Sequence, residues 1–370
     1  MKLDESAVTR RSFIQTTGAL GATVVATGPA TLLASAQTGT ASSEATNSKR
    51  SGIGKVALEE HVALAENPND PKAGADIQRL LAEMDQGEIE LAVLSPTSGQ
   101  VQDVPDRQKA IDMARSGNDY LANQVAKHPG RLAAFACLPL QDPDAAAREL
   151  DRSIKELKFK GAMIKGFSQI DKEESWVYCD MPQYWDLWGT MASLDVPMYL
   201  HPRYPVKGRG ESVDGHPYFR GSGWYFGYET ATHALRLMAS GLFDKHPNFT
   251  VILGHLGEML PSVMWRVDHR LVAESKRFGA VPAKKPLDYY FRNNFYVTTS
   301  GNFCTPTLTN TIEWAGTDRI MFSVDFPYES VPEAVQWFDG LKFSDADYRK
   351  IARGNAEKVL RLAQRKTVAS

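Results

Sequence analysis

Residues 251–258 read VILGHLGE: a short apolar run ends in a glycine, a histidine and, three residues later, a glutamate. A run this short and this apolar predicts a parallel strand that is buried on both faces. His255 and Glu258 follow at the carboxyl end of that strand. In a barrel of alternating strands and helices, catalytic side chains collect at this end. The stretch therefore predicts a buried barrel strand and the edge of a functional site.

Three other apolar runs end in the same way. They are KVALEEH with Glu59 and His61, PMYLHPR with His201, and IMFSVDFP with Asp325. Core packing does not require histidine or a carboxylate at these places, whereas a divalent metal ion does. Together the four strand ends predict a metal-dependent site.

The rest of the chain alternates between strand-like and helix-like segments. Strands are predicted at 55–60, 91–95, 131–139, 160–165, 197–201, 250–254, 295–299 and 319–324. Helices are predicted at 76–87, 105–127, 143–157, 182–194, 229–245, 260–276 and 305–315. Eight strands alternating with helices favour an α/β fold, a (β/α)₈ TIM barrel, over an open doubly wound sheet.

Two segments interrupt the alternation. Residues 277–294 are expected to be a loop or a short insertion. Residues 202–228 are rich in glycine, proline and aromatic residues and directly follow the strand that carries His201. A long segment in this position is expected to cover the active site.

Glu59 and His61 are two residues apart, so both side chains leave their strand on the face that points into a barrel. His201 and Asp325 add an imidazole and a carboxylate from distant strands. This mixed nitrogen and oxygen set predicts one divalent ion: Zn²⁺ is favoured, Mn²⁺ is the next choice, and Mg²⁺ is disfavoured by the two imidazoles.

His255 and Glu258 form a second unit beside the metal. A carboxylate three residues on can accept the imidazole N–H, fix its tautomer and raise its basicity. We therefore interpret the two residues as a proton-handling pair. A single histidine at a strand end, taken alone, is equally compatible with a rim residue without chemistry.

Two more residues are candidates for the substrate pocket. Arg266, in MWRVDHR, lies a few turns into the helix after His255 and is placed to hold a substrate carboxylate. An ion pair with Glu258 or Asp268 is the alternative for Arg266. His216, in DGHP, is a candidate lining residue or a plain surface histidine.

Composition excludes several classes of protein. The chain has 370 residues with 43% hydrophobic content, enough for one large domain. The net charge is −2, from 42 basic and 44 acidic residues, and no basic run is present, which argues against a nucleic-acid partner. Three cysteines are too few for a disulfide framework or a thiolate zinc site.

The amino-terminal segment is typical of a twin-arginine export signal. Arg10 and Arg11 stand in TRRSFIQ, an uncharged stretch follows at 16–33, and Ala-Ser-Ala at 34–36 offers a cleavage site. The stretch is too rich in glycine and threonine to span a bilayer. An ordinary helix with two chance arginines is the alternative.

With the export hypothesis, the chain divides into four parts. They are a signal at 1–36, a disordered linker at 37–52, the barrel at 53–366 and a tail at 367–370. The hypothesis predicts the twin-arginine export machinery as a partner, and a periplasmic or otherwise exported protein.

Several long motifs resemble the amidohydrolase-related decarboxylases, the group that includes γ-resorcylate and aminocarboxymuconate semialdehyde decarboxylases. They include KVALEEH, DVPMYLHPR, ILGHLGEMLPSVMWRVDHR and FSVDFPYE, and the similarity runs from about Lys55 to about Leu362. The resemblance implies a (β/α)₈ barrel that forms dimers or tetramers. It implies metal-dependent, non-oxidative decarboxylation of a small hydroxybenzoate-like acid, without an organic cofactor.

The resemblance also implies roles for individual residues. The metal would be bound by Glu59, His61, His201 and Asp325. Asp325, with His255 beside it and Glu258 assisting, would donate the proton. The residue matching Arg266 would help to hold the substrate.

Lys165, in GAMIKGF, departs from the pattern, because the resorcylate enzymes typically have asparagine there. It ends the fourth predicted strand, where hydrolytic amidohydrolases carry a carboxylated lysine that bridges two metal ions. Lys165 is thus either a substrate-binding residue or part of a binuclear hydrolase of an amide or lactone bond. Against the hydrolase, Glu59 occupies the first position of what would be a His-x-His pair. A non-catalytic metal-binding protein is the third interpretation.

Overall fold

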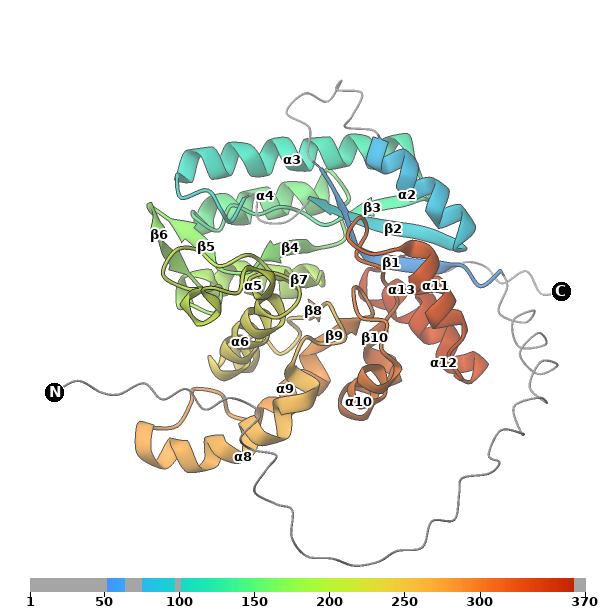
Figure 1. Cartoon of the computed structure of the whole chain (residues 1–370). Coiled ribbons are helices and arrows are strands. Elements are labelled where there is room, and N and C mark those ends of the chain that lie inside the picture. The colour runs from blue at the N-terminus through green and yellow to red at the C-terminus, as the bar shows by residue number, and fades with distance from the viewer. Residues whose placement is uncertain (1–51, 64–74, 97–100, 363–370) are drawn as a thin grey trace, which may run out of the picture. The chain divides into compact units, whose positions relative to one another are not determined.

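The computed structural model describes residues 52–63, 75–96 and 101–362. The predicted export signal and tail, and all but the last residue of the predicted linker, lie outside these ranges. Within them, eight parallel strands form the centre of the fold, with helices around them (Figure 1). The strands are β1 (Lys55–Val62), β2 (Ile89–Pro96), β3 (Leu132–Ala134), β4 (Ala162–Lys165), β7 (Met198–His201), β8 (Val251–Leu253), β9 (Phe295–Thr298) and β10 (Ile320–Met321).

The strands close into a barrel through two short junctions. They pair in the orders β1-β2-β3 and β10-β9-β8-β7-β4. Ala136, just after β3, bridges to Ala162 of β4, and Glu60 of β1 bridges to Phe326, just after β10. Parallel strands in this cyclic order place all eight carboxyl ends at one rim. The predicted (β/α)₈ barrel is therefore confirmed.

Side chains inside the barrel come from alternate positions along the strands. One buried cluster contains Val56, Val93, Met163, Ile252 and Met321, which belong to five different strands. A larger cluster lies between the outside of the barrel and the helices. Strands with apolar residues on both faces are buried on both, which is why β8 consists of the uninterrupted run VIL.

The helices cover the barrel from outside. They are α2 (Ala75–Gln86), α3 (Arg107–Lys127), α4 (Pro143–Lys155), α5 (Trp185–Leu194), α6 (Tyr225–Ala239), α7 (Leu242–Lys245), α8 (Leu260–Phe278), α9 (Leu287–Asn294), α10 (Thr305–Ala315), α11 (Val331–Asp339), α12 (Asp345–Arg349) and α13 (Asn355–Val359). Local capping sets several starts: the Asp106 and Asp142 side chains accept the backbone N–H of Lys109 and Ala145.

Several boundaries differ from the sequence-based prediction. The strand predicted at 131–139 is regular only over β3, because the chain then bends toward β4 through a single bridge. Residues 277–294, expected to be a loop, contain α9, whose buried Leu287, Tyr290 and Phe291 pack on the core. The antiparallel hairpin β5 (Ser168–Ile170) and β6 (Lys172–Val177), and helices α11–α13, were not predicted.

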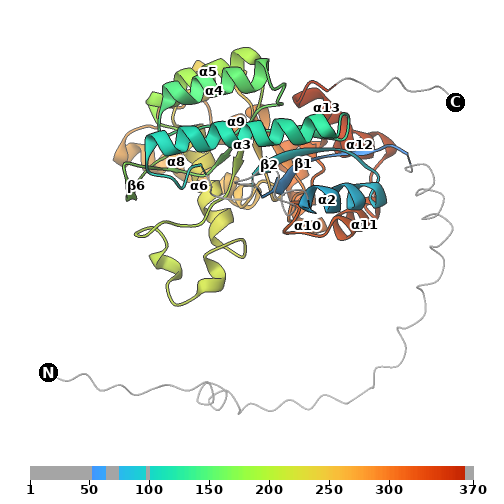
Figure 2. The ribbon, with the colours of Figure 1, turned by 90° about the horizontal axis from the view of Figure 1, so that it is seen from above.

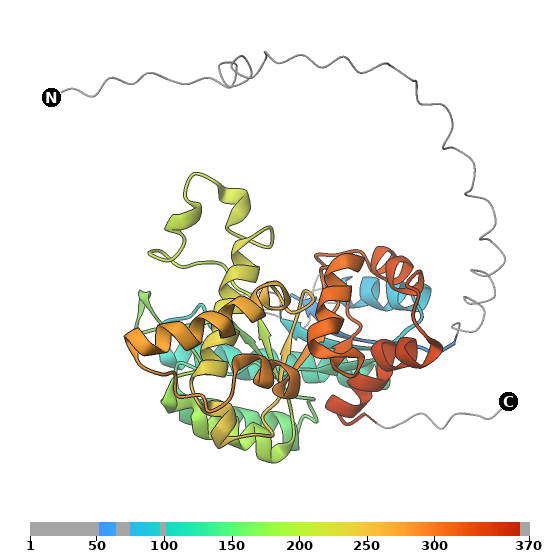
Figure 3. The ribbon, with the colours of Figure 1, turned by 90° about the horizontal axis from the view of Figure 1, so that it is seen from below.

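The segment after β7 projects from the barrel at the rim of the strand ends. It contains two 3₁₀ turns, η2 (Glu211–Val213) and η3 (Pro217–Phe219), before α6 begins at Tyr225, four residues earlier than predicted. Figures 2 and 3 show this yellow-green segment standing away from the rest of the barrel. In the described part of the chain, no helix combines the length and apolarity that a membrane span requires.

Candidate metal centre and active site

Four side chains predicted to bind a metal converge at the carboxyl rim of the barrel. Glu59 and His61 come from β1, His201 from the end of β7, and Asp325 from the turn after β10. Their ligand atoms all lie within 4.8 Å of one another, and all four residues are buried. Glu59 Oε1 is 3.1 Å from His201 Nε2, and His61 Nε2 is 3.2 Å from Asp325 Oδ1.

The unpaired atoms of this group face a common point. Glu59 Oε1, His61 Nε2 and Asp325 Oδ1 are buried and make no hydrogen bond with any described residue. A buried polar atom without a partner costs roughly 1–3 kcal/mol, so three such atoms on adjacent side chains need a common explanation. A divalent cation supplies it, since two imidazoles and two carboxylates are ligands for such an ion. The residues therefore fit a divalent metal site.

The outer nitrogens of both histidines have partners that set the tautomers. His201 Nδ1 donates to the carbonyl of Pro202 at 2.7 Å, which leaves Nε2 unprotonated toward the site. His61 Nδ1 lies 2.7 Å from Ser95 Oγ. Such outer contacts orient a metal ligand and raise its basicity.

Glu59 is held by two hydroxyl groups through its second oxygen. Oε2 accepts hydrogen bonds from Tyr199 and from Ser300. Burial raises the pKa of Glu59, but the neighbouring His255, His201 and His61 outweigh it, and the pKa falls well below its usual value. Sequence reasoning missed Tyr199, although it stands two residues before His201 and so faces the barrel interior like that ligand.

Glu60 fixes the turn that carries Asp325. Its carboxylate accepts hydrogen bonds from Ser323 Oγ at 3.0 Å and from the backbone N–H of Val324 and Phe326, both at 3.1 Å. Asp325 thus lies between two backbone groups that are tied to the first strand. Burial raises the pKa of Glu60 to about 8, although the three donors oppose that shift. No sequence pattern indicates this role, because a glutamate between two ligands resembles a neighbour without function.

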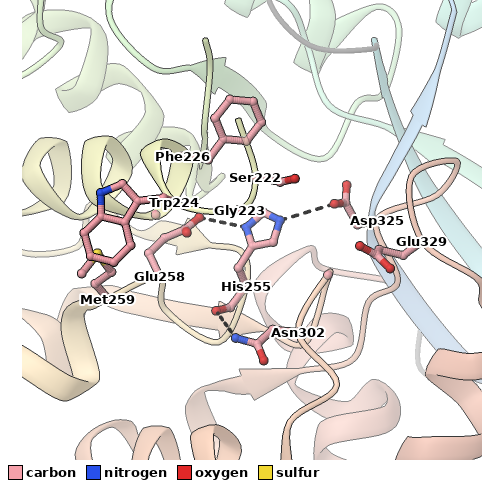
Figure 4. Close-up of a pocket in the computed structure, with 12 residues that line it drawn as sticks. Ser222, Gly223, Trp224, Phe226, His255, Glu258, Met259, Asn302, Asp325 and Glu329 are labelled. Atoms are coloured by element: carbon pink, nitrogen blue, oxygen red, sulfur yellow. Dashed lines mark hydrogen bonds and ion pairs between the residues drawn. The ribbon is translucent and has the colours of Figure 1, made fainter. Parts of the chain in front are cut away.

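His255 lies between two carboxylates, as Figure 4 shows. Its Nδ1 is 2.9 Å from Glu258 Oε1, and its Nε2 is 3.4 Å from Asp325 Oδ2. Burial lowers the pKa of His255, but the nearby Glu258 and Glu59 raise it by more, and the net shift is well upward. Burial raises the pKa of Asp325 to about 7, with Glu59 adding to the shift and His255 opposing it. The predicted proton-handling pair is thus in contact with a metal-site carboxylate.

The backbone around these groups is unusual. His255, Glu258 and Asp325 have φ values of 51°, 58° and 83°, in a region that residues other than glycine rarely adopt. Such conformations cluster at functional sites, where the surrounding structure imposes them. Gly301 permits the close packing, since a Cβ there would lie 2.6 Å from the His255 ring.

Two adjoining cavities, of about 220 and 250 Å³, open beside Asp325. A cavity of about 150 Å³ can hold a benzene ring, so either one accommodates a single substituted ring. Ser222 and Phe226 line both, and Trp224 lines one. The segment predicted to cover the site therefore contributes to its wall through its last residues and, in one cavity, also through Pro202 and Tyr204.

Three predicted pocket residues have other positions. Lys165 is buried behind His61: its Nζ donates to the carbonyl of Pro96 and lies 3.5 Å from His61 Nδ1, the nitrogen that faces away from the metal ligands. His216 is exposed and bonds to Tyr218. Neither His216 nor Arg266 lines the two cavities in this chain.

Arg266 is exposed on α8. Neither ion pair considered for it forms, because Asp268 accepts the backbone N–H groups of Leu287 and Asp288, and Glu258 bonds to His255. The role of Arg266 in holding a substrate stays a prediction.

Comparisons with known proteins agree with this geometry. A family model described as Amidohydrolase matches residues 60–362. The γ-resorcylate decarboxylase of a Polaromonas species is 48% identical over 324 residues, which cover 84% of this chain and 99% of that protein.

Solved structures of such enzymes have the same fold. The Polaromonas dihydroxybenzoic acid decarboxylase, solved with bound manganese and the inhibitor 2-nitroresorcinol, is 47% identical, with a TM-score of 0.78 over 84% of this chain and 97% of that one. A 2,6-dihydroxybenzoate decarboxylase in complex with 2,6-dihydroxybenzoate is 48% identical, with the same TM-score, over 84% and 99%. The chain therefore belongs to the amidohydrolase family, within which it groups with the γ-resorcylate decarboxylases.

Proposed function

We propose that this protein is a metal-dependent carboxy-lyase that decarboxylates 2,6-dihydroxybenzoate or a closely similar hydroxybenzoate without oxidation. The observation that carries the proposal is the convergence of four metal-binding side chains on one point, with Asp325 shared between that point and His255. The cavities beside Asp325 have the size of one aromatic ring, and relatives with nearly half their residues identical act on such acids.

We propose Mn²⁺ as the resident ion, in place of the Zn²⁺ favoured by the ligand types alone. The Polaromonas relative that was solved with the inhibitor 2-nitroresorcinol contains manganese. A ligand set with two carboxylates suits Mn²⁺ as well as Zn²⁺. Glu59, His61, His201 and Asp325 would hold it. When bound, the ion would orient the carboxylate and phenolic oxygens of the acid and withdraw charge as a Lewis acid.

The two oxygens of Asp325 have different surroundings. Oδ1 faces His61 in the metal group, and Oδ2 faces His255. Because Oδ2 faces His255 and not the metal group, this oxygen is the one that can carry a proton. Asp325 delivers that proton to the ring carbon that bears the carboxylate. The bond to the carboxylate then breaks, carbon dioxide leaves, and its bonding electrons restore the aromatic ring.

His255 returns a proton to Asp325 after each turnover. Its Nε2 lies 3.4 Å from Asp325 Oδ2, and Glu258 holds the opposite nitrogen at 2.9 Å. The Glu258 carboxylate stabilises the protonated imidazole, so the pair can accept a proton from solvent and pass it inward.

The position of Lys165 argues against the interpretation as a binuclear hydrolase. A bridging lysine carbamate would have to reach the Nε2 side of His61, where the other ligands lie. Lys165 Nζ instead contacts the Nδ1 side and the Pro96 carbonyl. Lys165 also lines neither cavity, so in this chain it supports His61 from behind.

Decarboxylation is tested with the full chain, stripped of metal and reloaded with Mn²⁺. Incubation with 2,6-dihydroxybenzoate should release carbon dioxide and 1,3-dihydroxybenzene. Asp325→Asn should abolish turnover, whereas Asp318→Asn, an exposed carboxylate before β10, should leave it unchanged. Turnover by the Asp325 variant, or none by the wild type on any ortho-hydroxybenzoate, would refute the proposal.

Export by the twin-arginine route and assembly into dimers or tetramers are further proposals, supported by the motif at Arg10 and Arg11 and by the family resemblance. Replacing both arginines by lysine should keep the protein inside the cell. Export of that variant by the same route would contradict the first proposal. A single-chain mass in light scattering would contradict the second.

A further inference from the structure

Glu329 is an acidic residue inside the pocket that the proposed reaction does not use. Its backbone N–H donates to the Asp325 carbonyl at 3.1 Å, so the side chain lies one turn after Asp325, beside it. Glu329 lines both cavities, together with Ser222, Phe226, His255 and Asp325. Figure 4 shows its carboxylate just below Asp325, among the residues that line the pocket.

The Glu329 carboxylate has no partner within the described part of the chain. No hydrogen bond or ion pair joins it to a described residue, although its neighbours Asp325 and Glu258 both contact His255. Burial raises the pKa of Glu329, as does the nearby Glu333, whereas His255, which lines the same cavities, lowers it. Among the described residues that line the two cavities, none is an arginine or a lysine. The Glu329 carboxylate is therefore an acceptor without a hydrogen-bonded donor, and no arginine or lysine among the described lining residues can pair with a second anion there.

We propose that Glu329 determines specificity: it accepts a hydrogen bond from a hydroxyl group on the ring and rejects rings that carry a second carboxylate. The inference rests on the proposed decarboxylation and narrows its substrate class to aromatic monocarboxylates with phenolic hydroxyl groups. A phenolic O–H offers a donor to a carboxylate, which makes a strong charge-assisted bond. A second carboxylate at that place would face the like charge of the half-buried Glu329, which disfavours binding.

Two compounds of nearly equal size separate these effects. One is 2,6-dihydroxybenzoate, and the other is 3-hydroxyphthalate, in which a carboxylate replaces one of the two hydroxyl groups. The full chain loaded with Mn²⁺ is assayed for kcat/KM on the first compound and for the inhibition constant of the second. The variants are Glu329→Gln, which removes the charge and keeps the shape, and Glu333→Gln as the matched control. Glu333 is exposed, lies four residues on, and lines neither cavity.

In Glu329→Gln, the inhibition constant of the dicarboxylate should fall by about tenfold or more, because the like charge is gone. The KM for 2,6-dihydroxybenzoate should rise while kcat changes little, since the proton donor is untouched. Glu333→Gln should keep the wild-type discrimination between the two compounds, because Glu329 keeps its carboxylate in that variant. An active Glu329→Gln enzyme with the same discrimination as Glu333→Gln would overturn the inference alone. A wild type that decarboxylates no hydroxybenzoate would overturn the proposed function instead.

Discussion

Replacing Tyr199 by phenylalanine tests whether the second oxygen of Glu59 sets the affinity for metal. The Tyr199 hydroxyl donates to Glu59 Oε2 and also lies 2.7 Å from Thr298 Oγ1. The ring is fully buried inside the barrel. Phenylalanine keeps that ring, so the change removes one hydrogen bond to a carboxylate without opening a large cavity.

The size of the effect follows from the bond that is lost. A hydrogen bond to a charged group contributes roughly 1.5–3 kcal/mol, which corresponds to about a tenfold to 150-fold change in an equilibrium constant. Ser300 still donates to Glu59 Oε2, so the carboxylate stays in place but is less firmly oriented. Loss of a partner that orients a ligand typically weakens metal binding about tenfold to 100-fold. We expect the dissociation constant for Mn²⁺ to rise within that range.

The assay is a competition titration of metal-free protein against a fluorescent chelator. Tyr296→Phe is the matched control, because Tyr296 belongs to the same cluster inside the barrel, and its hydroxyl forms no hydrogen bond with a metal-site residue in the described part of the chain. Urea unfolding of both metal-free variants separates a loss of stability from a loss of affinity. Equal Mn²⁺ affinities for Tyr199→Phe and Tyr296→Phe would refute the reasoning.

Further predictions concern the same site. Gly254→Ala would place a methyl group 2.5 Å from Glu59 Oε2. This overpacking should lower the free energy of unfolding by about 1–3 kcal/mol and weaken Mn²⁺ binding. An unchanged Mn²⁺ titration would contradict the packing described. Glu60→Gln leaves at least one donor around Asp325 without an acceptor. The free energy of unfolding should therefore fall by about 1–3 kcal/mol, and kcat should fall with it. A stable, fully active variant would exclude the role of Glu60 in positioning Asp325. Lys165 should carry no carbon dioxide adduct in the intact mass, and the protein should bind one ion per chain; an adduct with two ions would favour the hydrolase. Mn²⁺ at about a hundred times its dissociation constant should stabilise the metal-free protein by about 2.7 kcal/mol; an unchanged Tm would show that the folded site does not bind it.

The regular strands and most helices could be predicted from local sequence patterns. All eight barrel strands were predicted, because short apolar runs between helical segments have few other interpretations. Helix α9 was missed because its sequence LDYYFRNN is aromatic, short and preceded by prolines, so its helical period is weak. The strand after α10 was predicted too long, since the run IMFSV leaves regular pairing after Met321 and continues as the turn that Glu60 holds.

The sequence by itself determined the metal-binding set, because parallel strands bring their carboxyl ends to one rim whatever the loops do. Glu59, His61, His201 and Asp325 follow from that topology. Only the tertiary structure decided which side chains surround them. It placed Lys165 behind His61, left Arg266 and His216 exposed, and turned Glu329 into the pocket. These positions depend on how the strands, helices and rim turns pack against one another in three dimensions, which strand and helix periodicity does not encode.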